Sequence, residues 1–300
     1  MTLEGIIARA GAHPPLRVAI ANATDAMDIA AVQEACAFVH AVLVGPRAAI
    51  EETARRAGIS LDNCSIVAAD DALESARVAV ELVRRGEVDV LMKGSLHTDD
   101  FMRAVVAEPA LRTSRRMSQV VVIETPAFPR LIFVSDGAIN IAPTLEEKRD
   151  ITQNAIEVAR ACGVDVPRVA ILAAVETVSS HLPATVDAAA LAKMADRKQI
   201  VGGIVDGPLA LDDAVSPKAA ELKGIASRVA GYADVLIAPD LEVANVLFKE
   251  IEYFAAGRCA EIVVGARLPI ILTSRADDAF TRAASMALAS LLKNAGPVVA

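Results

Sequence analysis

The sequence predicts an α/β protein built from two doubly wound domains with a cleft between them, and three observations support this class. Hydrophobic residues make up 54% and charged residues 23% of the 300 residues, a balance that a disordered chain does not have. The apolar residues fall in short aliphatic runs, as in the strands of a buried parallel sheet. Helix-length segments separate these runs, which indicates a largely parallel sheet with helices on its faces. A chain of this length has room for two such domains.

The first third of the chain alternates regularly between strand and helix. Thr24 or Asp25 is the predicted cap of the first helix. Gly58 and Gly86 are predicted to end two later helices, because glycine adopts the left-handed conformation of a helix end without strain. The predicted strands are 16–21, 41–44, 65–67 and 88–92, and the predicted helices are 23–39, a helix ending at Ala57, 70–85 and 97–106.

The pattern changes in the segment 117–136. Two strands, 120–124 and 131–135, are separated only by a short segment with two prolines, which predicts a hairpin or a sheet edge. Alternation then resumes to the end of the chain. The predicted helices are 144–162, 185–197, 217–229, 240–255 and 277–292, and the predicted strands are 169–175, 200–205, 235–238, 261–264 and 268–272.

Charge and composition argue against several functional classes. The formal net charge is −8, which does not match a general nucleic-acid-binding surface. No apolar stretch reaches the ~18 residues of a membrane span, and the first residues lack the apolar core of a secretory signal. The spacing of Cys36, Cys64, Cys162 and Cys259 suits neither a zinc site nor a disulfide framework. We therefore expect a cytoplasmic protein that binds neither membrane, nucleic acid nor metal.

Polar residues follow four of the predicted strands, at the carboxyl ends where α/β sheets bind ligands. The first group is Lys93 with a Gly-Ser turn that includes Ser95, followed by Arg103 on the next helix. Such a turn exposes backbone N–H groups to an anion, and Lys93 or Arg103 adds positive charge. The alternative interpretation is a capped helix with Ser95 or Thr98 as the N-cap residue. His97, at the start of the same helix, is interpreted as structural.

The second group runs from Ser135 to Pro143 and includes Asp136, and the third runs from Val205 to Leu209 and includes Asp206 with the following Gly-Pro. A tight turn explains each of them as well as a ligand site does. Asp206, at the end of its strand, is a candidate to face the cleft. Neither group matches a dinucleotide-binding fingerprint or a phosphate-binding P-loop.

The fourth group runs from Thr273 to Asp278, directly after the last buried strand. Ser274 and Arg275 place a hydroxyl beside a guanidinium, and the planar fork of arginine matches phosphate bidentately. Ser274 with Asp277 three residues later also matches a helix-capping arrangement. A cap and a ligand site are compatible at one position.

Six short segments follow one another in a fixed order over nearly the whole chain. They are LMKG at 91–94, VSDGAIN at 134–140, PATVDAA at 183–189, VDGPL at 205–209, ADVLIAPDL at 233–241 and LPIILTSR at 268–275. Together these segments resemble the phosphate acetyltransferase and phosphate butyryltransferase family. The pair Tyr253-Phe254 stands where the acetyl-specific branch of that family usually has an arginine before the phenylalanine, which favours the butyryl branch.

The resemblance implies a fold and an activity. The fold is that of two α/β domains with a cleft, related to isocitrate and isopropylmalate dehydrogenases and typically dimeric. The implied domains are 1–114 plus 265–300, and 115–264. The implied reaction is acyl-CoA + phosphate = acyl phosphate + CoA, with a short acyl chain such as acetyl or butyryl and no cofactor besides the two substrates.

The resemblance also implies site residues. Ser274 and Arg275 match the family's catalytic Ser-Arg pair, and either Asp277 or Asp278 stands in for its catalytic aspartate, although the spacing differs. Arg103 matches an arginine on the helix after the phosphate-side strand. The further substrate-binding candidates from the strand ends are Lys93, Ser95 and Asp206.

Two other functions stay open at this point. A decarboxylating dehydrogenase of the related fold would need NAD(P) and a divalent metal held by clustered carboxylates, and the sequence shows no such cluster at clear spacing. A non-catalytic protein of the same fold that binds acyl-CoA or another metabolite would keep the fold and lose turnover.

Overall fold

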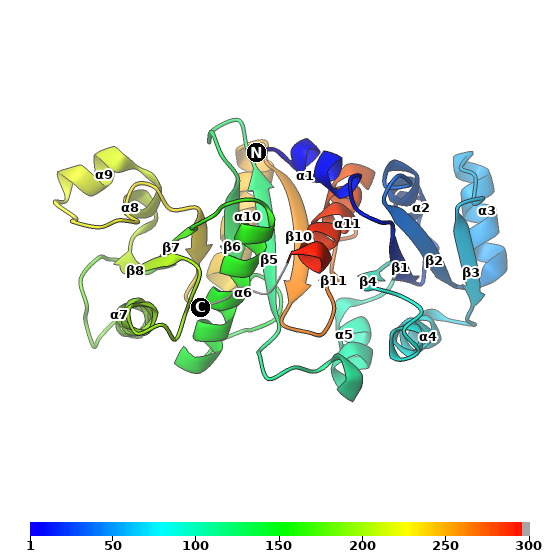
Figure 1. The fold of residues 1–300 in the computed structure, drawn as a ribbon, viewed down its shortest axis with the longest axis horizontal. Coiled ribbons are helices and arrows are strands. Elements are labelled where there is room, and N and C mark those ends of the chain that lie inside the picture. The colour runs from blue at the N-terminus through cyan, green and yellow to red at the C-terminus, as the bar shows by residue number, and fades with distance from the viewer. Residues whose placement is uncertain (296–300) are drawn as a thin grey trace. The chain divides into compact units, whose positions relative to one another are not determined.

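The computed structural model describes residues 1–295, which form two compact units (Figure 1). The first unit comprises Leu3–Arg115 and Ala260–Asn294, and the second is built mainly from Arg116–Cys259. Each unit holds a sheet of mainly parallel strands with helices on both of its faces. The α/β class is thus confirmed. Residues 296–300, at the end of the predicted first domain, lie outside the described residues.

The sheet of the first unit has the strand order β3-β2-β1-β4-β11-β10. Its strands are parallel except β10, which runs antiparallel to β11. Helices α1 and α2 contact α11 on one face, and α4 contacts α5 on the other (Figure 1). The elements are α1 (Leu3–Ala10), β1 (Leu16–Ala21), α2 (Ala26–Glu34), β2 (Val39–Gly45), α3 (Arg47–Ala57), β3 (Cys64–Ala68), α4 (Ala72–Arg84), β4 (Val90–Lys93), α5 (Thr98–Ala107), a 3₁₀ turn (Pro109–Leu111), β10 (Arg258–Val264), β11 (Ile270–Ile271) and α11 (Ala279–Asn294).

Local signals explain most element ends in this unit. The Asp71 carboxylate accepts a hydrogen bond from the Glu74 N–H and begins α4, and Gly58 ends α3 in the left-handed conformation with φ 69°. The predicted helix 23–39 is wrong at both ends. Asp25 caps α2, so the helix starts later, and Ala35 is its C-cap residue, so the helix also ends earlier. The chain beyond it buries Phe38.

The sheet of the second unit has the strand order β5-β6-β9-β7-β8. Strands β5 and β6 form the predicted antiparallel hairpin, and the other pairs are parallel. Helices α6 and α7 pack together, while α8, α9 and α10 share an apolar core with the opposite face of the sheet. The elements are β5 (Ser118–Glu124), β6 (Ile132–Ser135), α6 (Leu145–Ala161), β7 (Arg168–Leu172), α7 (Pro183–Asp196), β8 (Ile204–Leu209), α8 (Leu211–Val215), α9 (Pro217–Leu222), β9 (Val235–Ile237) and α10 (Leu241–Phe254).

The second unit corrects one long prediction. The predicted helix 217–229 ends at Leu222, because Gly224 adopts a positive φ of 65° and turns the chain. The start of α6, by contrast, agrees with the prediction, because Thr144 and Glu147 form a complete capping box there. Among the helices of residues 1–295, none combines the length and the apolar character needed to cross a bilayer.

Candidate active site

The first and fourth predicted groups meet at the carboxyl ends of two neighbouring strands in the first unit. Strand β4 ends at Lys93, and β11 is followed by Leu272 and then by Thr273, Ser274 and Arg275. The two strands are parallel, with Ile271 paired to Met92, so both carboxyl ends open on the same edge of the sheet. Segments far apart in the sequence are therefore brought together at the edge where α/β sheets bind ligands.

The turn after β11 is organised by Asp277, whose side chain is buried. The Asp277 carboxylate accepts a hydrogen bond from the backbone N–H of Ser274 at 2.7 Å, and the Ser274 hydroxyl accepts one from the Ala276 N–H at 3.3 Å. Asp278 is exposed and accepts from the Thr281 N–H at 2.8 Å, which caps the first turn of α11. The two candidate aspartates thus have different surroundings, and only Asp277 contacts the residue that carries the hydroxyl.

Arg275 points its guanidinium away from the core. The side chain is exposed, and Nη2 lies 3.4 Å from Nδ1 of His97 on the neighbouring segment. His97 therefore lies at the edge of the candidate site, although the sequence predicts a structural role for it. Its sequence signal is a position at the start of a helix, which is too common among histidines to indicate a ligand site.

Lys93 lies beneath this surface, with 4% of the residue exposed. Its Nζ is 3.4 Å from the Gly94 carbonyl oxygen. Burial lowers the pKa of Lys93, the positive charges of Arg282 and Arg275 lower it further, and the negative charges of Asp28 and Asp277 oppose this. Two guanidinium groups and two carboxylates therefore act on Lys93 at this edge, and the three cations outnumber the two anions.

The turn after Lys93 differs from the prediction. The N–H groups of Gly94 and Ser95 donate at 2.9 Å to the carbonyls of Ala21 and Asn22, and the Leu96 N–H donates to the Gly94 carbonyl. These three N–H groups are satisfied within the protein, so the predicted anion-binding turn is wrong. A side chain on Gly94 would place its Cβ 2.7 Å from the Ala21 carbonyl oxygen, so the close approach of the two segments requires glycine.

Helix α5 also starts differently from the alternative interpretation. Its N-cap residue is His97, with no side-chain cap, rather than Ser95 or Thr98. Arg103 lies on this helix with 74% of its side chain exposed, and it pairs with Asp100 at 3.1 Å. Within residues 1–295, the ion pair of Arg103 is with a residue of its own helix, and not with Lys93, Ser274 or Arg275.

Two buried residues of this region were not predicted. Arg282 of α11 forms an ion pair with Asp28 of α2, and their side chains are 3% and 0% exposed. Burial raises the pKa of Asp28 to about 6, while the attraction of Arg282 opposes the shift. The one signal in the sequence was an arginine within an otherwise small and apolar stretch of the last helix.

Asp206 lies in the second unit, on β8. One carboxylate oxygen accepts from the Gly207 N–H at 2.8 Å, and the other accepts from the Ser227 hydroxyl. Both oxygens are therefore engaged by neighbouring residues of the same unit.

Asp136 takes the role of a turn organiser. Its carboxylate is 3% exposed and accepts hydrogen bonds from the backbone N–H groups of Gln119, Ala138, Ile139 and Asn140. Burial raises its pKa, and these hydrogen bonds oppose the shift. The contacts support the tight-turn interpretation of this segment.

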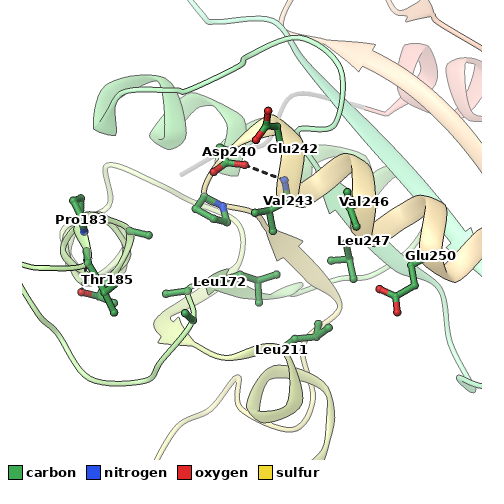
Figure 2. A pocket seen from close by; sticks show the side chains of 15 residues that line it. Leu172, Pro183, Thr185, Leu211, Asp240, Glu242, Val243, Val246, Leu247 and Glu250 are labelled. Atoms are coloured by element: carbon green, nitrogen blue, oxygen red, sulfur yellow. Dashed lines mark hydrogen bonds between the residues drawn. The ribbon is translucent and has the colours of Figure 1, made fainter.

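The second unit holds a pocket of about 660 Å³ at the carboxyl ends of β7 and β9 (Figure 2). Aliphatic side chains dominate its wall, and the labelled carboxylates are Asp240, Glu242 and Glu250. Asp240 accepts from the Val243 N–H at 2.9 Å and caps α10. The other labelled residues are Leu172, Pro183, Thr185, Leu211, Val246 and Leu247.

Comparison with known proteins gives consistent matches. A family model described as "Phosphate acetyl/butaryl transferase" matches residues 68–290. The phosphate acetyltransferase of Rickettsia typhi is 47% identical over 293 residues, which cover 96% of this chain and 84% of that protein. The phosphate butyryltransferase of Clostridium beijerinckii is 42% identical over 292 residues, which cover 96% and 97%. The crystal structure of a branched-chain phosphotransacylase from Enterococcus faecalis matches with a TM-score of 0.80 at 27% identity, covering 92% and 98%.

Proposed function

The chain belongs to the phosphate acetyl/butyryl transferase family, and we propose that it is a phosphate acyltransferase that exchanges a short acyl group between coenzyme A and inorganic phosphate. The observation that supports this best is the convergence of Ser274, Arg275 and Lys93 at the carboxyl ends of β4 and β11. A hydroxyl and two cations at one edge suit a reaction between a phosphate anion and an activated carbonyl.

The chemistry needs positioning more than an added nucleophile, since a thioester is already activated. A phosphate oxygen attacks the thioester carbonyl carbon, negative charge develops on the carbonyl oxygen, and the C–S bond then breaks to release the thiolate of coenzyme A. The exposed fork of Arg275 binds the phosphate, and Lys93 adds positive charge from below. The Ser274 hydroxyl donates to the developing oxyanion or to the departing sulfur, and one such donor contributes on the order of 10²–10³ in rate.

Of the two candidate aspartates, the contacts favour Asp277 as the group that handles the thiol proton. Asp277 contacts Ser274 directly, whereas Asp278 caps α11. In the direction of acyl-CoA synthesis, Asp277 accepts the proton of the attacking thiol, a step for which a positioned base contributes about 10²–10⁴. Arg103, which is exposed on α5, is assigned to a phosphate group of coenzyme A.

The direct test is phosphate-dependent release of free thiol from acetyl-, propionyl- and butyryl-CoA. Ser274→Ala and Arg275→Lys should each lose activity, and Arg275→Lys should also raise the KM for phosphate, because lysine cannot reproduce the bidentate fork. Arg84→Ala, which removes an exposed arginine of α4, serves as the control. Absence of thiol release with all three thioesters would reject the proposal, and the preferred thioester identifies the acyl chain.

We further propose that the enzyme is a cytoplasmic homodimer or larger homo-oligomer. Helix α10 supports self-association, because Val246, Tyr253 and Phe254 are 65%, 65% and 87% exposed. Light scattering coupled to size-exclusion chromatography should give a mass of at least two chains, and Phe254→Ser should lower the dimer population. The mass of a single chain at micromolar concentration would contradict self-association.

A further inference from the structure

The ion pair of Arg282 and Asp28 is buried almost completely and joins residues that lie 254 positions apart in the chain. A buried ion pair adds little net stability, because the loss of hydration offsets the attraction between the charges. The pair also contacts the turn that carries Ser274 and Arg275, through the remaining hydrogen bonds of the Arg282 guanidinium.

Arg282 uses all three nitrogens of its guanidinium. Nη1 donates to the Asp28 carboxylate, Nε donates to the Asp277 carbonyl at 3.2 Å, and Nη2 donates to the Ser274 carbonyl at 3.4 Å. The two carbonyls belong to the ends of the turn 274–277, so one rigid, planar group holds both ends of the turn that carries Ser274 and Arg275.

We propose that Arg282, oriented by Asp28, is a positioning residue for acyl transfer: its guanidinium fixes the turn 274–277 and thereby places the Ser274 hydroxyl and the Arg275 fork. This inference rests on the proposed function for its kinetic consequences. The holding of the turn itself is a structural property and can be measured without turnover.

The surroundings of Asp28 suit it to orient Arg282 and leave it no access to a substrate. Its side chain is fully buried, and its second oxygen, Oδ2, has no hydrogen-bond partner within the described part of the chain. That oxygen lies against the turn after β4, where a Cβ on Gly94 would come within 2.9 Å of it. Both oxygens are therefore enclosed by protein, one against Arg282 and one against Gly94.

The charged groups that act on Asp28 are Arg282 of α11, Asp25 at the start of α2 and Lys93 of β4. The pKa of Asp28 is about 6 in the folded state and about 3.9 in the unfolded state. At a pH between these two values, folding is therefore accompanied by the uptake of a proton by Asp28. Its contribution to stability therefore increases as the pH falls from about 6 toward 4. Over the same range Arg282 loses its anionic partner, so activity falls. Opposite trends of stability and activity distinguish positioning from a purely structural role.

The test compares Arg282→Lys, Arg282→Met and Asp28→Asn with a control variant that removes another arginine–aspartate pair of the same unit. Both Arg282 variants should lower kcat by about 100-fold, the typical consequence of displacing catalytic groups by about 1 Å. They should also raise the KM for phosphate more than the KM for acyl-CoA, since Arg275 binds phosphate. Backbone amides of the segment 273–278 should exchange hydrogen for deuterium faster than in the wild type. Asp28→Asn should lose less activity and should flatten the decline of activity below pH 6.

The control is Arg17→Met. Arg17 pairs with Asp89 at 2.8 Å at the amino ends of β1 and β4, the opposite end of the same sheet. This variant should lower the free energy of unfolding only slightly, because Arg17 is partly exposed and Asp89 keeps Lys293 as a partner at 2.6 Å. The kcat, both KM values and the exchange of 273–278 should stay within about twofold of the wild type.

Wild-type kcat, KM and amide exchange in Arg282→Lys would overturn the inference. If Arg282→Met does not fold, Arg282→Lys and Asp28→Asn decide the question. If the wild-type protein transfers no acyl group, the proposed function fails, while faster exchange of 273–278 in the Arg282 variants would still establish that Arg282 holds the turn.

Discussion

The two units place very different chemistry at equivalent positions of their sheets. At the carboxyl ends of β4 and β11 in the first unit, Lys93, Arg275 and Arg282 gather positive charge. At the carboxyl ends of β7 and β9 in the second unit, aliphatic side chains line a pocket of about 660 Å³ with Glu250 among its carboxylates (Figure 2). The first edge pairs its carboxylates with cations, whereas the described residues that line the pocket in the second unit include carboxylates and no lysine or arginine, so the first edge suits an anionic substrate better. The carboxyl ends of the strands are equivalent positions in the two sheets, and the side chains at these ends determine which ligand each of them suits.

The aspartates of the two units show how this difference arises. In the second unit, Asp136, Asp206 and Asp240 each accept hydrogen bonds from nearby backbone N–H groups and stabilise turns or a helix start. In the first unit, Asp277 does the same for the turn that carries Ser274, but it lies within reach of three cations. An aspartate at a strand end therefore indicates a site only where cations accompany it.

The largest effect is expected from a side chain added at Gly94, in the turn that follows Lys93. Gly94→Ala forces a Cβ to within 2.7 Å of the Ala21 carbonyl oxygen, so the turn after β4 must move. We expect a loss of about 1–3 kcal/mol in the free energy of unfolding, typical of overpacking, together with at least a 100-fold loss of kcat/KM. Urea unfolding and the thiol-release assay measure the two effects.

Gly203→Ala in the second unit is the matched control. Its Cβ would come within 2.9 Å of the Pro167 carbonyl oxygen, a similar collision at a position that is not among the candidate site residues. Stability should fall by a similar amount while kcat/KM stays within about threefold of the wild type, since strain alone does not remove a site. Equal kinetic losses in both variants would show that the first edge has no special role.

The next effect concerns the alkaline side of the pH profile. Because burial lowers the pKa of Lys93, this lysine loses its proton at a lower pH than an ordinary lysine. Its deprotonation in the folded state makes stability rise with pH in that window, while activity falls as the charge disappears. Lys93→Met should lower kcat/KM about 100-fold, as for loss of a charge-stabilising donor, and should remove this alkaline decline.

Lys148→Met provides the comparison from the second unit. Lys148 has 8% of its side chain exposed and pairs with Asp187 at 2.7 Å, so it is also a buried lysine. Its replacement should leave the alkaline decline in place. An unchanged pH–rate profile in Lys93→Met would remove Lys93 from the phosphate side of the mechanism.

The sequence predicted much of the fold because its signals are local. The strand Leu16–Ala21 and the helix end at Gly58 follow from an aliphatic run and a left-handed glycine, and both are confirmed. The resemblance to the acyltransferase family is likewise confirmed by the family model and the full-length relatives. Helix lengths were less predictable, as at Leu222, because a periodic pattern continues past the glycine that ends the helix.

The site was less predictable because its parts are distant in the sequence. Ser274, Arg275 and Lys93 could be named from strand ends, and the parallel pairing of β4 and β11 brings them together. The pairing of Arg282 with Asp28 could not be named, since nothing local to either residue indicates the other. The occupied N–H groups of the turn after β4 were also missed, because their acceptors lie on β1 and beyond its end.

A smaller effect is expected for Arg103, which is exposed and paired with Asp100. If it contacts a substrate phosphate, Arg103→Ala should raise the KM for acyl-CoA or phosphate about tenfold, equivalent to the loss of one charged hydrogen bond. Arg84→Ala is the control, since Arg84 forms the same kind of exposed pair with Glu81 on α4. Identical KM values for the two variants would remove Arg103 from the substrate-binding residues.

The smallest kinetic effect is expected for Asp206, and it tests the second unit directly. Because its two oxygens already accept from Gly207 and Ser227, Asp206→Asn should destabilise the unit by about 1 kcal/mol, typical of a lost hydrogen bond, and leave the KM values within about twofold. Ser227→Ala should have a similar effect, and the double variant should lose less than the sum, because both changes remove the same contact. Urea unfolding of the three variants measures this coupling. An increase in KM for either substrate in Asp206→Asn that is absent in Ser227→Ala would instead assign Asp206 to substrate binding. A carboxylate of the second unit would then take part in the reaction that we propose for the first.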